Sequence, residues 1–179
     1  SPSMDILISS NLERFLFAMT GNDGDKVAAW MDALKQDGMF TVDAETRANM
    51  DKFITGGAAD ETETLAMIGK CYDESKYVLD THTAVAVKVA RDYRAASSTE
   101  NIAVIDSTAH PCKFVSSVLS AFDDVEKKES ELEMLEQLVN LTGISQHKGL
   151  QDLDKKPVLH STVCEKDEIS AAVQRILGI

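Results

Sequence analysis

The stretch from Asn101 to Phe114 reads NIAVIDSTAHPCKF, and it decides how the chain is expected to fold. Four apolar residues, Ile102 to Ile105, are followed by a polar corner from Asp106 to His110. Pro111 then opens an amphipathic segment, and proline is favoured at the first position of a helix because its missing N–H is not needed there. The pattern predicts a buried strand, a tight turn and the N-terminus of a helix.

This corner is the first candidate for a functional site. Open α/β sheets bind ligands beyond the carboxyl ends of their strands, which is where such a turn lies. Ser107, Thr108 and His110 are the polar side chains at that place. A second interpretation is that the corner only caps the helix, since polar residues are common at helix N-termini. The residues of the corner leave both interpretations open.

Composition limits the class of protein. The 179 residues carry a net charge of −12, which argues against nucleic acid and anionic membranes as partners because an acidic surface repels phosphates. No apolar run approaches the roughly 20 residues of a membrane helix, and the first residues lack the pattern of a signal peptide. The three cysteines are widely spaced, which is typical of reduced thiols in a cytoplasmic protein.

Residues before position 77 have the pattern of successive helices. Capping boxes are predicted at Ser10–Glu13 and Asp60–Glu63, and again later at Ser130–Glu133. In a capping box, a side chain at the helix start and an acidic residue three positions later accept hydrogen bonds from each other's backbone N–H. Aspartates cap two further helices, at Asp23 or Asp25 and at Asp43, and the helix from Asp43 is expected to pass Met50 and Phe53 before Gly56 and Gly57 end it. Gly21, Gly38 and Gly143 are the other expected helix ends.

The pattern changes at Tyr77–Thr83, where a second short apolar run meets a polar corner. Residues 84–93 then predict a small valine-rich helix. Pro157 to Ser161 is read as another short strand, Met4 to Ile8 as a strand end or extended lead-in, and Ile169 to Ile176 as a terminal amphipathic helix.

The residues alone do not identify a reaction. The four histidines lack the spacing of a metal site, and neither a nucleophile elbow nor a standard phosphate-binding loop is present. Lys113 lies in the first turn of a predicted helix, where a solvated amine is the usual role. The two polar corners are the features that remain.

Three stretches together resemble threonine synthase, a pyridoxal-phosphate enzyme. They are SPSMDI at 1–6 leading into SSNLER at 9–14, LDTHTAV at 79–85 and STAHPCKF at 107–114. Their order and spacing, and the helical segment between the first two, are similar to that family. Thr81 is a departure, since the family usually has proline there.

The resemblance implies a fold as well as an activity. The expected class is α/β but predominantly helical, as a partial three-layer pyridoxal-phosphate fold type II large domain with a few short strands. Residues 1–20 would be the lead-in and first helix of that domain, 21–76 a helical insert and 77–179 the strand–helix remainder. The resemblance covers only the carboxy-terminal portion of the enzyme. The lysine that holds the cofactor and the glycine-rich phosphate loop would lie upstream, so this chain would supply no catalytic residue, would not bind the cofactor by itself and would be inactive alone.

The resemblance also assigns roles to single residues. Thr108 corresponds to the residue whose hydroxyl faces the pyridine nitrogen of pyridoxal 5'-phosphate, and Ser107 would belong to the same cofactor-binding wall. The substrate would be O-phospho-L-homoserine, which reacts with water to give L-threonine and phosphate. Candidates on the substrate side are His82, Thr83, His110, Asn11 and Arg14. Arg14 offers either a bidentate fork to a carboxylate or phosphate, or a surface ion pair.

Two alternatives to this interpretation stay open at the sequence level. One is a non-catalytic helical α/β module that binds a partner protein or a small acid. The other is a different pyridoxal-phosphate lyase of the same fold group. In a partial sheet, unpaired strand edges would either associate between copies of the chain or be shielded by its helices.

Overall fold

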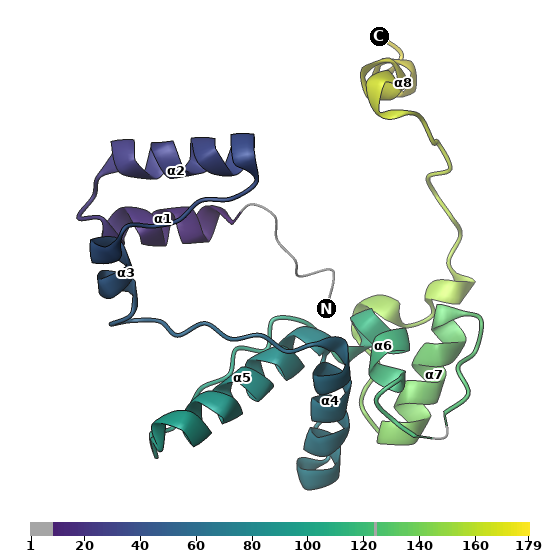
Figure 1. Cartoon of the computed structure of the whole chain (residues 1–179). Helices are drawn as coiled ribbons and strands as arrows, with labels where there is room; N and C mark the ends of the chain where they lie inside the picture. Colours follow the sequence, from purple (N-terminus) through teal and green to yellow (C-terminus); the bar gives the residue numbers. More distant parts are fainter. Residues whose placement is uncertain (1–8, 124) are drawn as a thin grey trace. The chain divides into compact units, whose positions relative to one another are not determined.

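The computed structural model describes residues 9–123 and 125–179, and its regular elements in these ranges are helices (Figure 1). Two compact units divide the chain, Ser1–Ile144 and Ser145–Ile179, and each is described by itself. The first unit contains α1 (Ser10–Met19), α2 (Gly24–Asp37), α3 (Ala44–Met50), α4 (Glu61–Ser75), α5 (Thr81–Ser97), the 3₁₀ helix η2 (Pro111–Phe114), α6 (Val115–Leu119) and α7 (Glu131–Thr142). The second contains η3 (Lys148–Leu150), η4 (Leu153–Lys155), η5 (Lys166–Glu168) and α8 (Ile169–Leu177).

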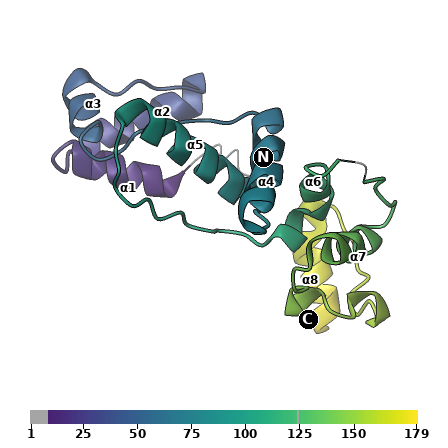
Figure 2. The ribbon, with the colours of Figure 1, turned by 90° about the horizontal axis from the view of Figure 1, so that it is seen from below.

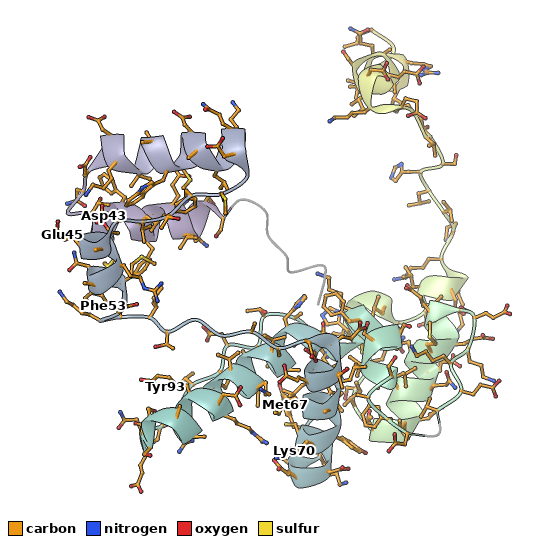
Figure 3. The ribbon with its side chains drawn as sticks, viewed as in Figure 1. Asp43, Glu45, Phe53, Met67, Lys70 and Tyr93 are labelled. Atoms are coloured by element: carbon orange, nitrogen blue, oxygen red, sulfur yellow. The ribbon has the colours of Figure 1, made fainter. Side chains whose placement is uncertain are left out.

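Helix α1 packs against both α2 and α3, which lie beside it in Figure 1. Its apolar stripe buries Leu16, and α2 contributes the buried Val27. The Asn49 side-chain amide of α3 donates a hydrogen bond to the carbonyl of Met19, with a distance of 3.0 Å. An ion pair of 2.9 Å between Lys26 and Asp43, which is labelled in Figure 3, links α2 to the start of α3.

Helices α4 and α5 form the second packed pair. Met67, labelled in Figure 3, and Ile68 are the buried apolar residues of α4, and Ala84 is buried on α5. Ion pairs join the partly exposed sides of the two helices, Lys88 with Glu63 at 3.1 Å and Arg91 with Glu74 at 2.7 Å. Because these charges are partly exposed, the apolar contacts contribute more to the stability of the pair.

Helices α6 and α7 lie side by side in both ribbon views (Figures 1 and 2) and bury Val118, Leu119 and Leu138 between them and their neighbours. The residues that follow α6 also touch α4 closely. A Cβ atom added to Gly69 would lie 2.9 Å from the carbonyl oxygen of Ala121, and the rings of Tyr72 and Phe122 meet edge to face at 5.2 Å. The α4–α5 and α6–α7 pairs are therefore joined through α4.

Most of the predicted helix signals are confirmed. Asp23 and Asp43 accept hydrogen bonds from the backbone N–H groups three positions later, and the capping box of Asp60 with Glu63 has both of its hydrogen bonds. Gly38 and Gly143 adopt positive φ at the ends of α2 and α7, as a glycine helix end requires.

Two of the predicted helix boundaries are wrong, and two of the predicted capping boxes are not formed. Ser9, and not Ser10, caps α1, so Glu13 lies one position too late to complete a capping box. Ser130 caps α7 without a side-chain hydrogen bond. Helix α3 ends at Met50, and the N–H groups of Lys52 and Phe53 bond to the carbonyls three positions earlier, in a tighter terminal turn.

The predicted short strands are absent from the described residues. Residues 102–105 are extended but unpaired, with Ile102 93% exposed and Val104 86% exposed, and the segment at 157–161 is also exposed. Their absence has a simple cause: a strand needs a neighbouring backbone to bond its N–H and C=O groups, and the described part of the chain supplies none. The segment predicted at Met4–Ile8 lies outside the described residues.

The second unit ends in the predicted terminal helix α8, which follows η5 directly. Of the apolar face predicted for this helix, Ala172 is buried, whereas Ile169, Val173 and Ile176 are exposed. A search of the described helices for one both long and apolar enough to cross a bilayer found none.

Candidate functional site

The structure brings the two predicted corners together at the start of α5. In chain order, the first corner is Tyr77–Thr83 and the second corner is Ser107–Phe114. Asp80 caps this helix, and its carboxylate is almost completely buried, with 1% of the residue exposed. It accepts hydrogen bonds from the N–H groups of His82 (2.9 Å) and Thr83 (3.1 Å) and from the Thr83 hydroxyl. The Thr83 hydroxyl oxygen in turn lies 3.4 Å from the hydroxyl oxygen of Ser107, 24 residues further along the chain.

A second contact joins the same two corners. The His82 ring meets the ring of Phe114 edge to face, with centroids 4.6 Å apart and an interplanar angle of 73°. The Nδ1 atom of His82 is buried and has no hydrogen-bond partner among the described residues. Burial of the ring lowers the pKa of His82, the Asp80 carboxylate opposes this change, and the charge of Lys113 adds to it. The imidazole is therefore neutral at neutral pH.

His110 connects the second corner to the helix that follows it. Its Nδ1 atom accepts a hydrogen bond of 3.2 Å from the backbone N–H of Cys112, which makes it the cap of η2. Pro111 opens this helix as predicted, but the first turn is a 3₁₀ helix, and α6 starts only after Phe114 leaves helical geometry. His110 thus has a capping role in the structure, at the edge of the corner that it was predicted to line.

Thr108, predicted to face the cofactor, lies on the exposed part of this corner next to Ser107, which is also exposed. The Ser107 hydroxyl has the Ala109 carbonyl as a second neighbour, at 3.5 Å. Two adjacent hydroxyl side chains are consequently available to a ligand at the end of the extended segment. Thr83, behind them, is buried.

Asn11 and Arg14 form a separate group on α1. The Arg14 guanidinium donates a hydrogen bond of 3.1 Å to the Asn11 side-chain oxygen. Arg14 borders a small cleft of about 300 Å³ between α1 and α2, which Glu13, Phe17 and Val27 also line. The contacts that the structure gives these two residues lie within the helices α1 and α2, and not at the corner.

Sequence reasoning missed Asp80, the residue with the most bonds at this site. The available signal was the pattern Asp-x-x-Thr at the end of an apolar run, which places a capping carboxylate three residues before a hydroxyl. The same pattern occurs at Asp43 and Thr46, where the Thr46 N–H donates to Asp43 at 2.8 Å. Asp43 is partly exposed, whereas Asp80 is buried beneath the second corner.

Comparison with known proteins gives this arrangement a context. Residues 83–168 match the family model described as threonine synthase, C-terminal. The threonine synthase of Pseudomonas aeruginosa is 38% identical over 121 residues, which cover 68% of this chain and 25% of that protein. The crystal structure of threonine synthase from yeast superposes with a TM-score of 0.79 at 28% identity, over 99% of this chain and 36% of that one. The chain belongs to the threonine synthase family.

A second solved member of this family is the threonine synthase of Brucella melitensis, determined with bound pyridoxal phosphate. It has a TM-score of 0.60 and 35% identity, and the match covers 76% of this chain and 29% of that one. The chain thus spans between about a quarter and a third of the length of these relatives. The expected resemblance to the carboxy-terminal portion of the family is confirmed, and the second corner, from Ser107 to Phe114, lies within the matched residues.

Proposed function

We propose that this chain is the carboxy-terminal portion of a threonine synthase, which converts O-phospho-L-homoserine and water to L-threonine and phosphate. The observation that carries the proposal is the 3.4 Å contact between Thr83 and Ser107, which joins the two motifs that resemble the family into one site. Both residues lie in the part of the chain that matches the family model. The chain would supply one wall of the active site, and an upstream portion would supply the rest.

The residues at the second corner suit pyridoxal 5'-phosphate as the cofactor. The exposed Thr108 hydroxyl would donate a hydrogen bond to the pyridine nitrogen, and Ser107 would contact the same side of the ring. A hydroxyl leaves the nitrogen unprotonated, whereas a carboxylate would favour the protonated form. When bound, the cofactor acts as the electron sink of the reaction, and a neutral ring makes that sink a milder one.

On the substrate side, His82 is the candidate that the geometry supports best. Its neutral ring is held against Phe114 next to Thr83, and its buried Nδ1 atom has no partner in the part of the chain that the structure describes. His110 would act through its cap on η2, which fixes the backbone after Thr108. Asn11 and Arg14 would reach the substrate only in the assembled enzyme, where Arg14 would present its fork to a carboxylate or phosphate.

The extended segment 102–105 supports the finer part of the proposed fold, a type II large domain. Two of its apolar residues, Ile102 and Val104, are exposed, which suits a strand whose neighbours come from the upstream portion. In that enzyme residues 1–20 and 77–179 belong to the large domain and residues 21–76 form a helical insert. We place the enzyme in the cytoplasm, in keeping with three free cysteines.

A fusion protein tests the proposed function. The amino-terminal portion of the Pseudomonas aeruginosa relative, joined to this chain at the matched boundary, is expected to release phosphate from O-phospho-L-homoserine and to form threonine, whereas this chain alone is expected to do neither. Thr108→Val in the fusion should lower kcat, because the ring nitrogen loses its donor. A well-folded fusion that binds pyridoxal phosphate but forms no threonine would contradict the proposed function. It would favour another lyase of the fold group, or a module that binds a partner or small acid without chemistry.

A further inference from the structure

The hydroxyl groups of Thr83 and Ser107 form a chain that ends on a buried carboxylate. The Thr83 hydroxyl has one proton, and the Asp80 carboxylate, which only accepts hydrogen bonds, receives it. No second proton is left on Thr83 for the contact of 3.4 Å to Ser107. That contact is then a hydrogen bond only if the Ser107 hydroxyl is the donor.

We infer that Asp80 and Thr83 are positioning residues that fix the Ser107 hydroxyl, so that Ser107 meets a bound ligand as a hydrogen-bond acceptor while Thr108 remains the donor. The inference rests on the proposed function and deepens it. Ser107 donates its hydroxyl proton to Thr83, and Thr83 donates its own to Asp80. Each of these hydrogen bonds strengthens the other because the last acceptor is charged and buried. The competing contact of Ser107, to the Ala109 carbonyl at 3.5 Å, lacks this support.

This chain of hydrogen bonds gives the neighbouring hydroxyls of Ser107 and Thr108 different roles toward a ligand, one as acceptor and the other as donor. A serine whose proton is already used presents only lone pairs to the ligand, so it selects a donor group such as an ammonium, a hydroxyl or a ring N–H. It does not suit a phosphate or carboxylate oxygen. The cofactor phosphate and the substrate phosphate are therefore expected to bind away from Ser107.

Helix capping alone does not explain the chain of hydroxyls. Asp43 and Thr46 repeat the same Asp-x-x-Thr cap at the start of α3, and the Thr46 side chain also bonds to its carboxylate. Thr46 is as deeply buried as Thr83, but its hydroxyl interacts with Asp43, the residue that caps its own helix. Thr46→Val is thus a matched control: it removes the same interaction between a threonine hydroxyl and a capping aspartate, at a position far from the second corner in the sequence.

The test on the isolated chain uses NMR and needs no activity. Thr83→Val should move the Ser107 and Thr108 resonances and increase amide exchange across residues 106–109, whereas Thr83→Ser and Thr46→Val should leave them unchanged. Should the valine variant fold poorly, Ser107→Ala on the exposed loop breaks the same contact, and it should move the Thr83 methyl resonance. If Thr83→Val perturbs the corner no more than Thr46→Val does, or if Thr83→Ser perturbs it equally, the inference is wrong.

The fusion protein supplies the functional half of the test. Thr83→Val and Asp80→Asn are expected to weaken pyridoxal-phosphate binding about fivefold, which corresponds to about 1 kcal/mol at 25 °C, and to change kcat more than KM. Thr46→Val should change neither. If the unmodified fusion forms no threonine while the NMR differences are present, the proposed function fails and the hydroxyl chain stands. If the fusion is active and Thr83→Val behaves like Thr46→Val, the hydroxyl chain fails alone.

Discussion

Gly69→Ala tests whether α4 really packs against the segment that follows α6. An alanine Cβ would lie 2.9 Å from the carbonyl oxygen of Ala121, a distance that real Cβ atoms essentially never show. Because the obstacle is backbone, relief requires a movement of the helix or of the segment. Overpacking of this kind costs about 1–3 kcal/mol, and the higher helix propensity of alanine returns about 1 kcal/mol. The expected net effect is a loss of up to about 2 kcal/mol in the free energy of unfolding.

The sign of this effect is the informative result. In a helix that is open to solvent at position 69, the same substitution would stabilise the chain by about 1 kcal/mol. Urea unfolding followed by circular dichroism measures the difference, and Gly56→Ala, where a Cβ would meet nothing within 4 Å, is the control. A more stable Gly69→Ala variant would refute the packing of α4 on this segment, and with it the link from the helical region to the second corner.

Three further predictions concern charge and association. The N–H of Thr46 and then Lys26 lower the pKa of Asp43 to about 2, so the unfolded chain binds more protons than the folded chain between pH 2 and 3.8. The free energy of unfolding should therefore rise as the pH rises from 2 to 3.8, and a ¹³C titration of Asp43 should have its midpoint near 2. Burial lowers the pKa of His82 below 6.5, so its contribution to stability is complete above pH 6.5 and should decline as the pH falls; His82→Gln should remove that part of the pH dependence, and an unchanged profile would contradict it. The exposed residues of the extended segment should drive concentration-dependent association, which Val104→Lys should reduce in sedimentation, whereas a clean monomer before substitution would count against such pairing.

The helical part of the fold was predictable because its signals are local. Asp23, Asp43 and Asp60 each precede an apolar stripe, and a capping carboxylate acts within a single turn. The error at Ser10 shows the limit of this reasoning. Two adjacent serines offer equivalent caps, and the pattern alone does not select between them.

The strands were not predictable from local pattern, because pairing depends on partners elsewhere. Residues 102–105 have the apolar run of a buried strand, but the described chain provides no neighbouring backbone for it. An apolar run shows only that a segment favours burial. The absent partner backbone explains why a correct reading of the residues gave an element that the structure lacks.

The site was partly predictable. Motif resemblance selected His82, Thr83 and Ser107, and the structure brings them to one place. The resemblance did not select Asp80. The local pattern Asp-x-x-Thr identifies this residue as a helix cap, but its burial depends on a corner 24 or more residues away in the sequence. Thr108 was assigned by resemblance alone, and its role stays a prediction.

The location of the lysine that holds the cofactor is the most direct test of the central claim, that this chain is one wall of a divided active site. Pyridoxal phosphate is added to the isolated chain and to the fusion with the Pseudomonas aeruginosa portion, borohydride then fixes it on the lysine that binds it, and mass spectrometry identifies that residue. The account predicts no specific label on the isolated chain, and in the fusion a label on a lysine of the upstream portion. A stoichiometric label on a lysine of this chain, such as Lys113, would contradict it.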